Sequence, residues 1–124
     1  MSAILIVEDN DKNLKLVRDV LRFKGYETLE ATTAGEGLRL ARAELPMLVL
    51  MDIQLPDFDG ITALARLRED PVTRTIPVIA VSASAMPDDQ QRIIASGFNA
   101  YITKPIDVKS FIQTVEKFVG TAKK

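Results

Sequence analysis

Five short apolar runs alternate with five longer segments in which apolar residues recur at helical spacing, and this alternation limits the possible folds more than any other feature. Three runs are continuously apolar, which is typical of strands covered on both faces, and one alternates polar with apolar residues, which is typical of an edge strand. In chain order, the predicted strands are Ala3–Val7, Glu27–Ala31, Met47–Met51, Pro77–Val81 and Ala100–Thr103.

The segments between these runs are predicted to be amphipathic helices. Gly25 and Gly97 are expected to end the first and fourth helices, Pro87 to open the fourth, and Asp107 to cap the fifth. Five strands alternating with five helices predict a doubly wound α/β sandwich around a parallel sheet. The residues predicted to face inward are Leu14, Val17 and Leu21; Leu38, Ala41 and Leu45; Ile61, Leu64 and Leu67; Ile93 and Ile94; and Phe111, Val115 and Phe118.

Length and composition restrict the class of protein. A chain of 124 residues suits one domain, 1–124, with a frayed tail at about 120–124. The net charge is −1 and the acidic and basic residues are interspersed, so the chain has no positive electrostatic field that would bind nucleic acid. The absence of cysteine and histidine excludes disulfides, structural zinc and histidine bases. The apolar stretch at the N-terminus is too short for a signal peptide or a membrane span, so a cytoplasmic protein is expected.

Polar residues follow four of the predicted strands at the end where ligands bind in folds of this kind. Glu8 and Asp9 follow the first strand, Asp52 the third, Ser82 the fourth and Lys104 the fifth. Any one of them alone is more simply explained as a cap or loop residue. Because the carboxyl ends of parallel strands share one edge of a sheet, their combination favours a functional site.

The electrostatics of three clustered acids indicate a bound cation. Two unit charges about 4 Å apart repel by roughly 4 kcal/mol at an effective dielectric constant near 20. Oxygen ligands without histidine or cysteine suit Mg²⁺, and Lys104 supplies a second positive charge. An aspartate beside such an ion can attack phosphorus and form an aspartyl-phosphate, with the Ser82 hydroxyl donating to a phosphoryl oxygen. The sequence therefore predicts a metal-assisted phosphoacceptor at Asp52.

Four stretches of the sequence match a known family: Ile6–Asn10, Met51–Gly60, Val81–Ala83 and Lys104–Pro105. Through these stretches, and over essentially its whole length, the chain resembles the receiver domain of two-component response regulators. The resemblance implies a flavodoxin-like (βα)5 sandwich with a five-stranded parallel sheet in the order 2-1-3-4-5. Asn10 and Asn13 add a similarity to hybrid-kinase receivers and to single-domain cell-cycle regulators.

The resemblance also implies a role for each matched residue. Asp52 is the phosphorylated residue, Lys104 pairs with the phosphoryl oxygens, and the bond from Lys104 to Pro105 is cis. Ser82 and Tyr101 form a pair that moves on phosphorylation. The implied ligands of Mg²⁺, or of Mn²⁺ in its place, are Glu8, Asp9, Asp52 and the backbone carbonyl of Gln54.

The implied partners are a histidine kinase or histidine phosphotransferase as donor and a downstream protein on the face of the fourth helix, last strand and last helix. No contact with nucleic acid or membrane is expected. One alternative is a receiver module that belongs to a longer hybrid kinase or transcription factor. Another is an aspartate-nucleophile phosphatase, but Gln54 stands where such enzymes carry a second acid, so no turnover is expected. A flavin-phosphate binder is disfavoured because the acidic loop Glu8–Asp11 would repel phosphate.

Overall fold

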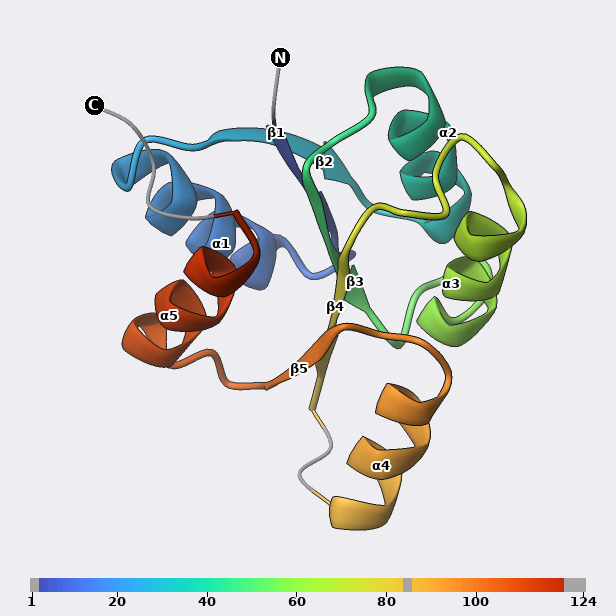
Figure 1. The fold of residues 1–124 in the computed structure, drawn as a ribbon. Helices are drawn as coiled ribbons and strands as arrows, with labels where there is room; N and C mark the ends of the chain where they lie inside the picture. Colours follow the sequence, from blue (N-terminus) through green and yellow to red (C-terminus); the bar gives the residue numbers. More distant parts are fainter. Residues whose placement is uncertain (1–2, 84–85, 120–124) are drawn as a thin grey trace.

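The computed structural model describes residues 3–83 and 86–119 and shows a parallel sheet between two layers of helices (Figure 1). The strand order is β2-β1-β3-β4-β5, which confirms the order implied by the resemblance. The expected tail at 120–124 lies outside the described residues. The strands are β1 (Ala3–Val7), β2 (Glu27–Ala31), β3 (Leu48–Asp52), β4 (Val78–Ser82) and β5 (Ala100–Thr103).

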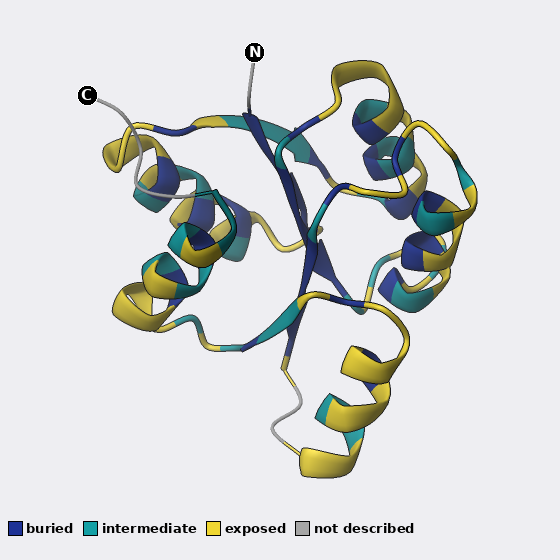
Figure 2. Cartoon of the chain, in the orientation of Figure 1, coloured by how far each residue is buried: buried dark blue, intermediate teal, exposed yellow. Residues whose placement is uncertain are grey.

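Two helices cover one face of the sheet and three cover the other (Figure 1). The first layer is formed by α1 (Asp11–Phe23) and α5 (Val108–Val119). The second layer is formed by α2 (Ala34–Glu44), α3 (Gly60–Glu69) and α4 (Pro87–Ala95). Figure 2 shows that the buried residues lie along the strands and on the helix faces that meet them. Among the described residues, no helix has both the length and the apolar character that crossing a bilayer requires.

Successive residues of a strand point to opposite faces of the sheet, so each central strand contributes to both cores. Ile6 and Leu50 pack in the core beneath α1 and α5, whereas Val7 and Met51 pack in the core beneath the other three helices. In β3 this alternation of side chains between the two faces continues to the last, polar residue of the strand. Asp52 therefore follows Leu50 toward the α1–α5 layer.

The predicted helix ends are confirmed. Gly25 and Gly97 follow α1 and α4 with φ of 97° and 120°, a conformation that glycine adopts without steric cost. Pro87 occupies the first turn of α4. The Asp107 carboxylate accepts a hydrogen bond from the backbone N–H of Ser110 at 3.3 Å, as a cap of α5 should.

Two of the predicted strands are displaced by one residue. β3 and β4 begin after Met47 and Pro77, and they include Asp52 and Ser82. Hydrophobicity marks the apolar part of a strand, but hydrogen bonding sets its ends. The Ser82 carbonyl still accepts a bond, from the Lys104 N–H at 2.8 Å, and this bond extends the pairing to the polar residue.

Two of the predicted inward-facing residues are exposed, and those predictions are wrong. Ile94 is 39 % exposed because adjacent helical residues lie about 100° apart and Ile93 already faces the sheet. Leu45 is 54 % exposed because it follows the last residue of α2 in the left-handed conformation, with φ of 49°. The other predicted residues are buried or pack against a core.

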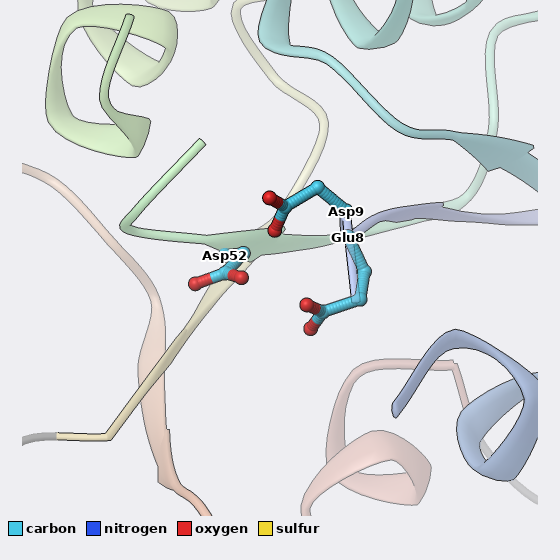
Figure 3. A group of neighbouring side chains, drawn as sticks. All are labelled: Glu8, Asp9 and Asp52. Atoms are coloured by element: carbon cyan, nitrogen blue, oxygen red, sulfur yellow. The ribbon is translucent and has the colours of Figure 1, made fainter. Parts of the chain in front are cut away.

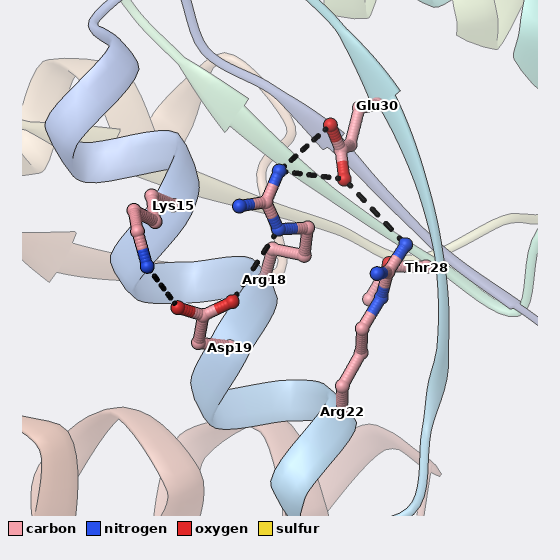
Figure 4. A network of polar contacts seen from close by, with 6 residues as sticks. All are labelled: Lys15, Arg18, Asp19, Arg22, Thr28 and Glu30. Carbon is pink, nitrogen blue, oxygen red and sulfur yellow. Dashed lines mark hydrogen bonds and ion pairs between the residues drawn. The ribbon is translucent and has the colours of Figure 1, made fainter.

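The edge strand β2 is covered on its α1 side by charged side chains (Figure 4). The Arg18 guanidinium lies 3.5 Å from the Glu30 carboxylate, and Arg22 Nε donates to Thr28 Oγ1 at 3.0 Å. These long side chains lie over a half-buried face without adding apolar surface. The alternation of polar and apolar residues in β2 is thereby explained.

Candidate functional site

The predicted site residues lie at one edge of the sheet. Glu8 follows β1, Asp52 and Ser82 end β3 and β4, and Lys104 follows β5. The start of α3 packs directly against the backbone of Asp52, where a Cβ on Gly60 would lie 2.5 Å from the Asp52 carbonyl oxygen. Only glycine allows this approach, so the contact fixes the end of β3 against α3.

Three carboxylates converge at this edge (Figure 3). Glu8, Asp9 and Asp52 each offer one oxygen, and these oxygens all lie within 4.8 Å of one another. Glu8 and Asp52 are 3 % and 4 % exposed, whereas Asp9 is open to solvent. The group is therefore buried at Glu8 and Asp52 and open to solvent at Asp9.

Lys104 reaches this group from β5. Its Nζ lies 3.1 Å from Glu8 Oε1 and 3.0 Å from Asp52 Oδ2. The peptide bond between Lys104 and Pro105 is cis, as the resemblance implied. One cation thus contacts two of the three acids, and the site retains an excess of negative charge.

Burial and charge together set the protonation of the site. Burial, followed by the hydrogen bond and the negative charge of Asp52, raises the pKa of Glu8 to about 7, although hydrogen bonds from Lys104 and the Asn10 N–H act in the opposite direction. Burial opposes the charged form of Lys104, but its hydrogen bonds to Asp52 and Glu8 hold its pKa above the usual value. A second cation at the acids would favour the ionised form of Glu8.

The donor set suits a hard divalent cation. It consists of carboxylate oxygens, which Mg²⁺, Mn²⁺ and Ca²⁺ prefer, and the described residues add no nitrogen or sulfur ligand because the chain lacks histidine and cysteine. The Gln54 backbone lies beside the group, since its N–H donates to Asp52 Oδ1 at 3.1 Å. The use of the Gln54 carbonyl as a ligand remains a prediction.

Ser82 and Tyr101 lie on neighbouring strands. Ser82, 8 % exposed, pairs with Thr103 across the β4–β5 ladder, and Tyr101 precedes Thr103 by two residues in β5. Tyr101 is half-buried and packs against the core beneath α2, α3 and α4. Ser82 and Tyr101 are therefore near neighbours in the sheet. Their joint movement on phosphorylation remains a prediction.

One residue of the loop after Asp52 has a role that the sequence did not suggest. The Asp57 carboxylate accepts hydrogen bonds from the backbone N–H groups of Ala34 and Gly35, both at 2.9 Å. Asp59, in contrast, caps α3 locally by accepting from the Thr62 N–H at 2.8 Å. A cap leaves a sequence signal three residues away, but a bond between distant segments leaves none.

The similarity to known proteins extends over almost the entire chain. A model of the response regulator receiver domain matches residues 4–116. The polar-differentiation response regulator DivK of Brucella ovis is 48 % identical over 120 residues, which cover 97 % of this chain and 98 % of that protein. The DivK protein of Brucella melitensis matches with the same figures.

Solved receiver structures have the same fold. The receiver domain of the sensor histidine kinase PA1611 from Pseudomonas aeruginosa, solved with a magnesium ion coordinated in its active site cleft, superposes with a TM-score of 0.88 at 29 % identity, covering 96 % of this chain and 98 % of that one. A CheY-like receiver domain protein from Methanospirillum hungatei gives a TM-score of 0.84 at 32 % identity, covering 94 % and 92 %. With its sheet order, its acidic edge and these relatives, the chain belongs to the family of response regulator receiver domains.

Proposed function

We propose that Asp52 accepts a phosphoryl group from a histidine kinase or a histidine phosphotransferase, in a reaction that depends on Mg²⁺. One observation carries the proposal: the buried Asp52 carboxylate lies 3.0 Å from Lys104 Nζ and within 4.8 Å of oxygens of Glu8 and Asp9. Phosphorylation of an aspartate is the general function of receiver domains, and histidine kinases are their general partners. The proposal includes residues 1–124 as a single receiver domain.

In this reaction, some residues around Asp52 neutralise charge and others position the reacting groups. An oxygen of Asp52 attacks phosphorus while the bond to the donor imidazole nitrogen breaks, and the electron pair of that bond stays on the imidazole. Lys104, which pairs with Asp52 and Glu8, turns to the oxygens of the transferred group. Glu8, Asp9, Asp52 and the Gln54 carbonyl would hold Mg²⁺, with Mn²⁺ as a substitute, and the ion neutralises phosphoryl charge when bound.

The signal leaves by protein contact in this proposal. A phosphoryl group adds nearly two negative charges and three strong acceptors, which Ser82 and Lys104 are placed to meet. Tyr101 and the exposed Ile94 line a shallow pocket of about 370 Å³ between α4 and β5, and a downstream protein would dock on the α4–β5–α5 face that includes this pocket. Direct contact with nucleic acid or membrane is not part of the proposal. Because histidine kinases draw on cytoplasmic ATP, the proposed location is the cytoplasm.

The reaction can be tested without the natural donor. The protein is incubated with acetyl phosphate, with and without Mg²⁺, and its intact mass is measured. We expect one phosphoryl adduct on the unmodified protein in Mg²⁺, none without the metal, and none on Asp52→Asn. Asp19→Asn, which changes an exposed acid of α1, is the matched control and should react normally. An adduct that persists in Asp52→Asn, or that forms equally well in EDTA, would contradict the proposal.

We also propose that the protein promotes only its own phosphorylation and dephosphorylation. Gln54 stands two residues after the nucleophile, where phosphatases with an aspartate nucleophile place a general acid. A steady-state assay with p-nitrophenyl phosphate should therefore give no more product than the buffer alone. Sustained turnover that Asp52→Asn abolishes would contradict this part of the proposal.

A further inference from the structure

Asp57 connects the loop that follows Asp52 to the start of α2 through both of its carboxylate oxygens. Oδ1 accepts from the Ala34 N–H and Oδ2 from the Gly35 N–H, each at 2.9 Å. Ala34 and Gly35 are the first two residues of α2, and N–H groups at this position have no acceptor within their own helix. One side chain thus meets two neighbouring donors that lie 23 and 22 residues earlier in the chain.

The helix does not need Asp57 as its N-cap. Thr33 already caps α2, since its hydroxyl oxygen accepts from the Glu36 N–H at 3.1 Å. The approach of Asp57 is close, because a Cβ on Gly35 would lie 3.3 Å from Asp57 Oδ2. The N–H of Gly35 lowers the pKa of Asp57, so the carboxylate is ionised and both hydrogen bonds are charge-assisted. What Asp57 adds is a link between the helix and the loop.

Both segments that Asp57 connects, the loop after Asp52 and α2, contact residues next to the three acids. Asp57 lies three residues after Gln54, whose N–H donates to Asp52 Oδ1. The helix that Asp57 contacts, α2, also packs tightly on β1, since a Cβ on Gly37 would lie 2.7 Å from Val7 Cγ2. Val7 immediately precedes Glu8. The link therefore joins the loop that contains Gln54 to the strand that leads into Glu8 and Asp9.

We propose that Asp57 is a positioning residue for the cation: it holds the loop at Gln54 in register with the acids that follow β1, so that cation affinity depends on its two hydrogen bonds to α2. This inference rests on the proposed function, because it takes the Gln54 carbonyl as a ligand. Asp57 itself touches neither the ion nor the phosphoryl group. Its action passes through the backbone between residues 54 and 57.

Two matched variants separate positioning of the loop from stabilisation of the helix. Asp57→Ala removes two acceptors from the start of α2 and Thr33→Ala removes one, but only Asp57→Ala releases the loop. Mg²⁺ is titrated into each protein while the amide NMR signals of Asp9 and Gln54 are followed. We expect the Kd for Mg²⁺ to rise about threefold to tenfold in Asp57→Ala, the effect of losing one to two hydrogen bonds, and to stay unchanged in Thr33→Ala.

Urea denaturation of the same variants should show a loss of stability in both, so the Kd for Mg²⁺ is the measurement that discriminates between them. Asp57→Asn, which keeps one acceptor oxygen and loses the charge, should give an intermediate Kd and serves if Asp57→Ala does not fold. A Kd that is unchanged in Asp57→Ala and Asp57→Asn, or that rises equally in Thr33→Ala, overturns the inference. Absence of Mg²⁺ binding to the unmodified protein would instead contradict the proposed function.

Discussion

At the scale of single residues, folding places the Glu8 carboxylate in an environment very different from that of the unfolded chain. Its carboxylate is almost fully buried, and burial together with the neighbouring Asp52 raises its pKa from 4.5 to about 7. A carboxyl group whose pKa is raised by folding binds its proton more tightly in the folded state. Its contribution to stability is fully present below pH 4.5 and is lost as the pH rises through about 7.

This sign gives a prediction for the metal-free protein. The quantity to follow is the free energy of unfolding of the unmodified protein minus that of Glu8→Gln. This difference should fall by roughly 1 to 3 kcal/mol between pH 4.5 and 7.5. Urea denaturation in EDTA at several pH values measures it. The control is Glu36→Gln, since Arg39 lowers the pKa of Glu36 and the corresponding difference should not fall. A difference that is independent of pH in Glu8→Gln would contradict the prediction.

The sequence located the acids and Lys104 at one edge because parallel strands end on the same side of a sheet. It did not predict the pKa of Glu8, since burial at the end of β1 depends on the packing of other strands and helices. It also gave no sign of the bonds from Asp57 to Ala34 and Gly35, which join segments that are distant in the chain. Local patterns predict where functional groups emerge, but not which distant backbone they contact.

At the scale of helices and strands, the errors other than that at Ile94 lie at the ends of the elements. β3 and β4 extend to Asp52 and Ser82 because hydrogen bonding continues beyond the apolar run. The periodic pattern placed Leu45 on the inward stripe of α2, but the helix ends one residue earlier. Apolar spacing predicts which elements exist, and backbone hydrogen bonds determine where they stop.

Leu45 therefore offers a test of backbone strain. Its φ of 49° is unfavourable for a residue with a branched side chain, and more than half of that side chain is exposed. Leu45→Gly should raise the free energy of unfolding by about 0.5 to 1 kcal/mol, because glycine adopts this conformation without steric cost. Chemical denaturation measures the change.

The same replacement two positions earlier is the control. Ala43 is an exposed residue within α2, where glycine has a lower helix propensity than alanine. Ala43→Gly should lower the free energy of unfolding by about 0.5 to 1 kcal/mol. If both substitutions changed stability in the same direction, the left-handed conformation of Leu45 would not be a source of strain.

At the scale of the whole molecule, a chain with a net charge of only −1 concentrates three acids at one edge of its sheet. A bound cation would relieve their repulsion and should raise the melting temperature. Above the Kd, each tenfold increase in Mg²⁺ adds about 1.4 kcal/mol to the free energy of unfolding. Differential scanning fluorimetry across a series of Mg²⁺ concentrations measures this response.

Asp9→Asn should remove most of the response to Mg²⁺. The metal-free melting temperature should stay the same or rise slightly, because the substitution removes one of the repelling charges at an exposed position. Asp11→Asn, which changes another exposed acid two residues later, should respond to Mg²⁺ as the unmodified protein does. A full response in Asp9→Asn would show that the ion binds elsewhere.

The alternation of side chains along the strands has a consequence for how the two halves of the molecule communicate. Asp52 continues the row of β3 side chains that faces α1 and α5, whereas Ser82 continues the row of β4 that faces α2, α3 and α4. A ligand that bridges Asp52 and Ser82 must straddle the rim of the sheet. It would join two helical layers whose cores the sheet otherwise keeps apart.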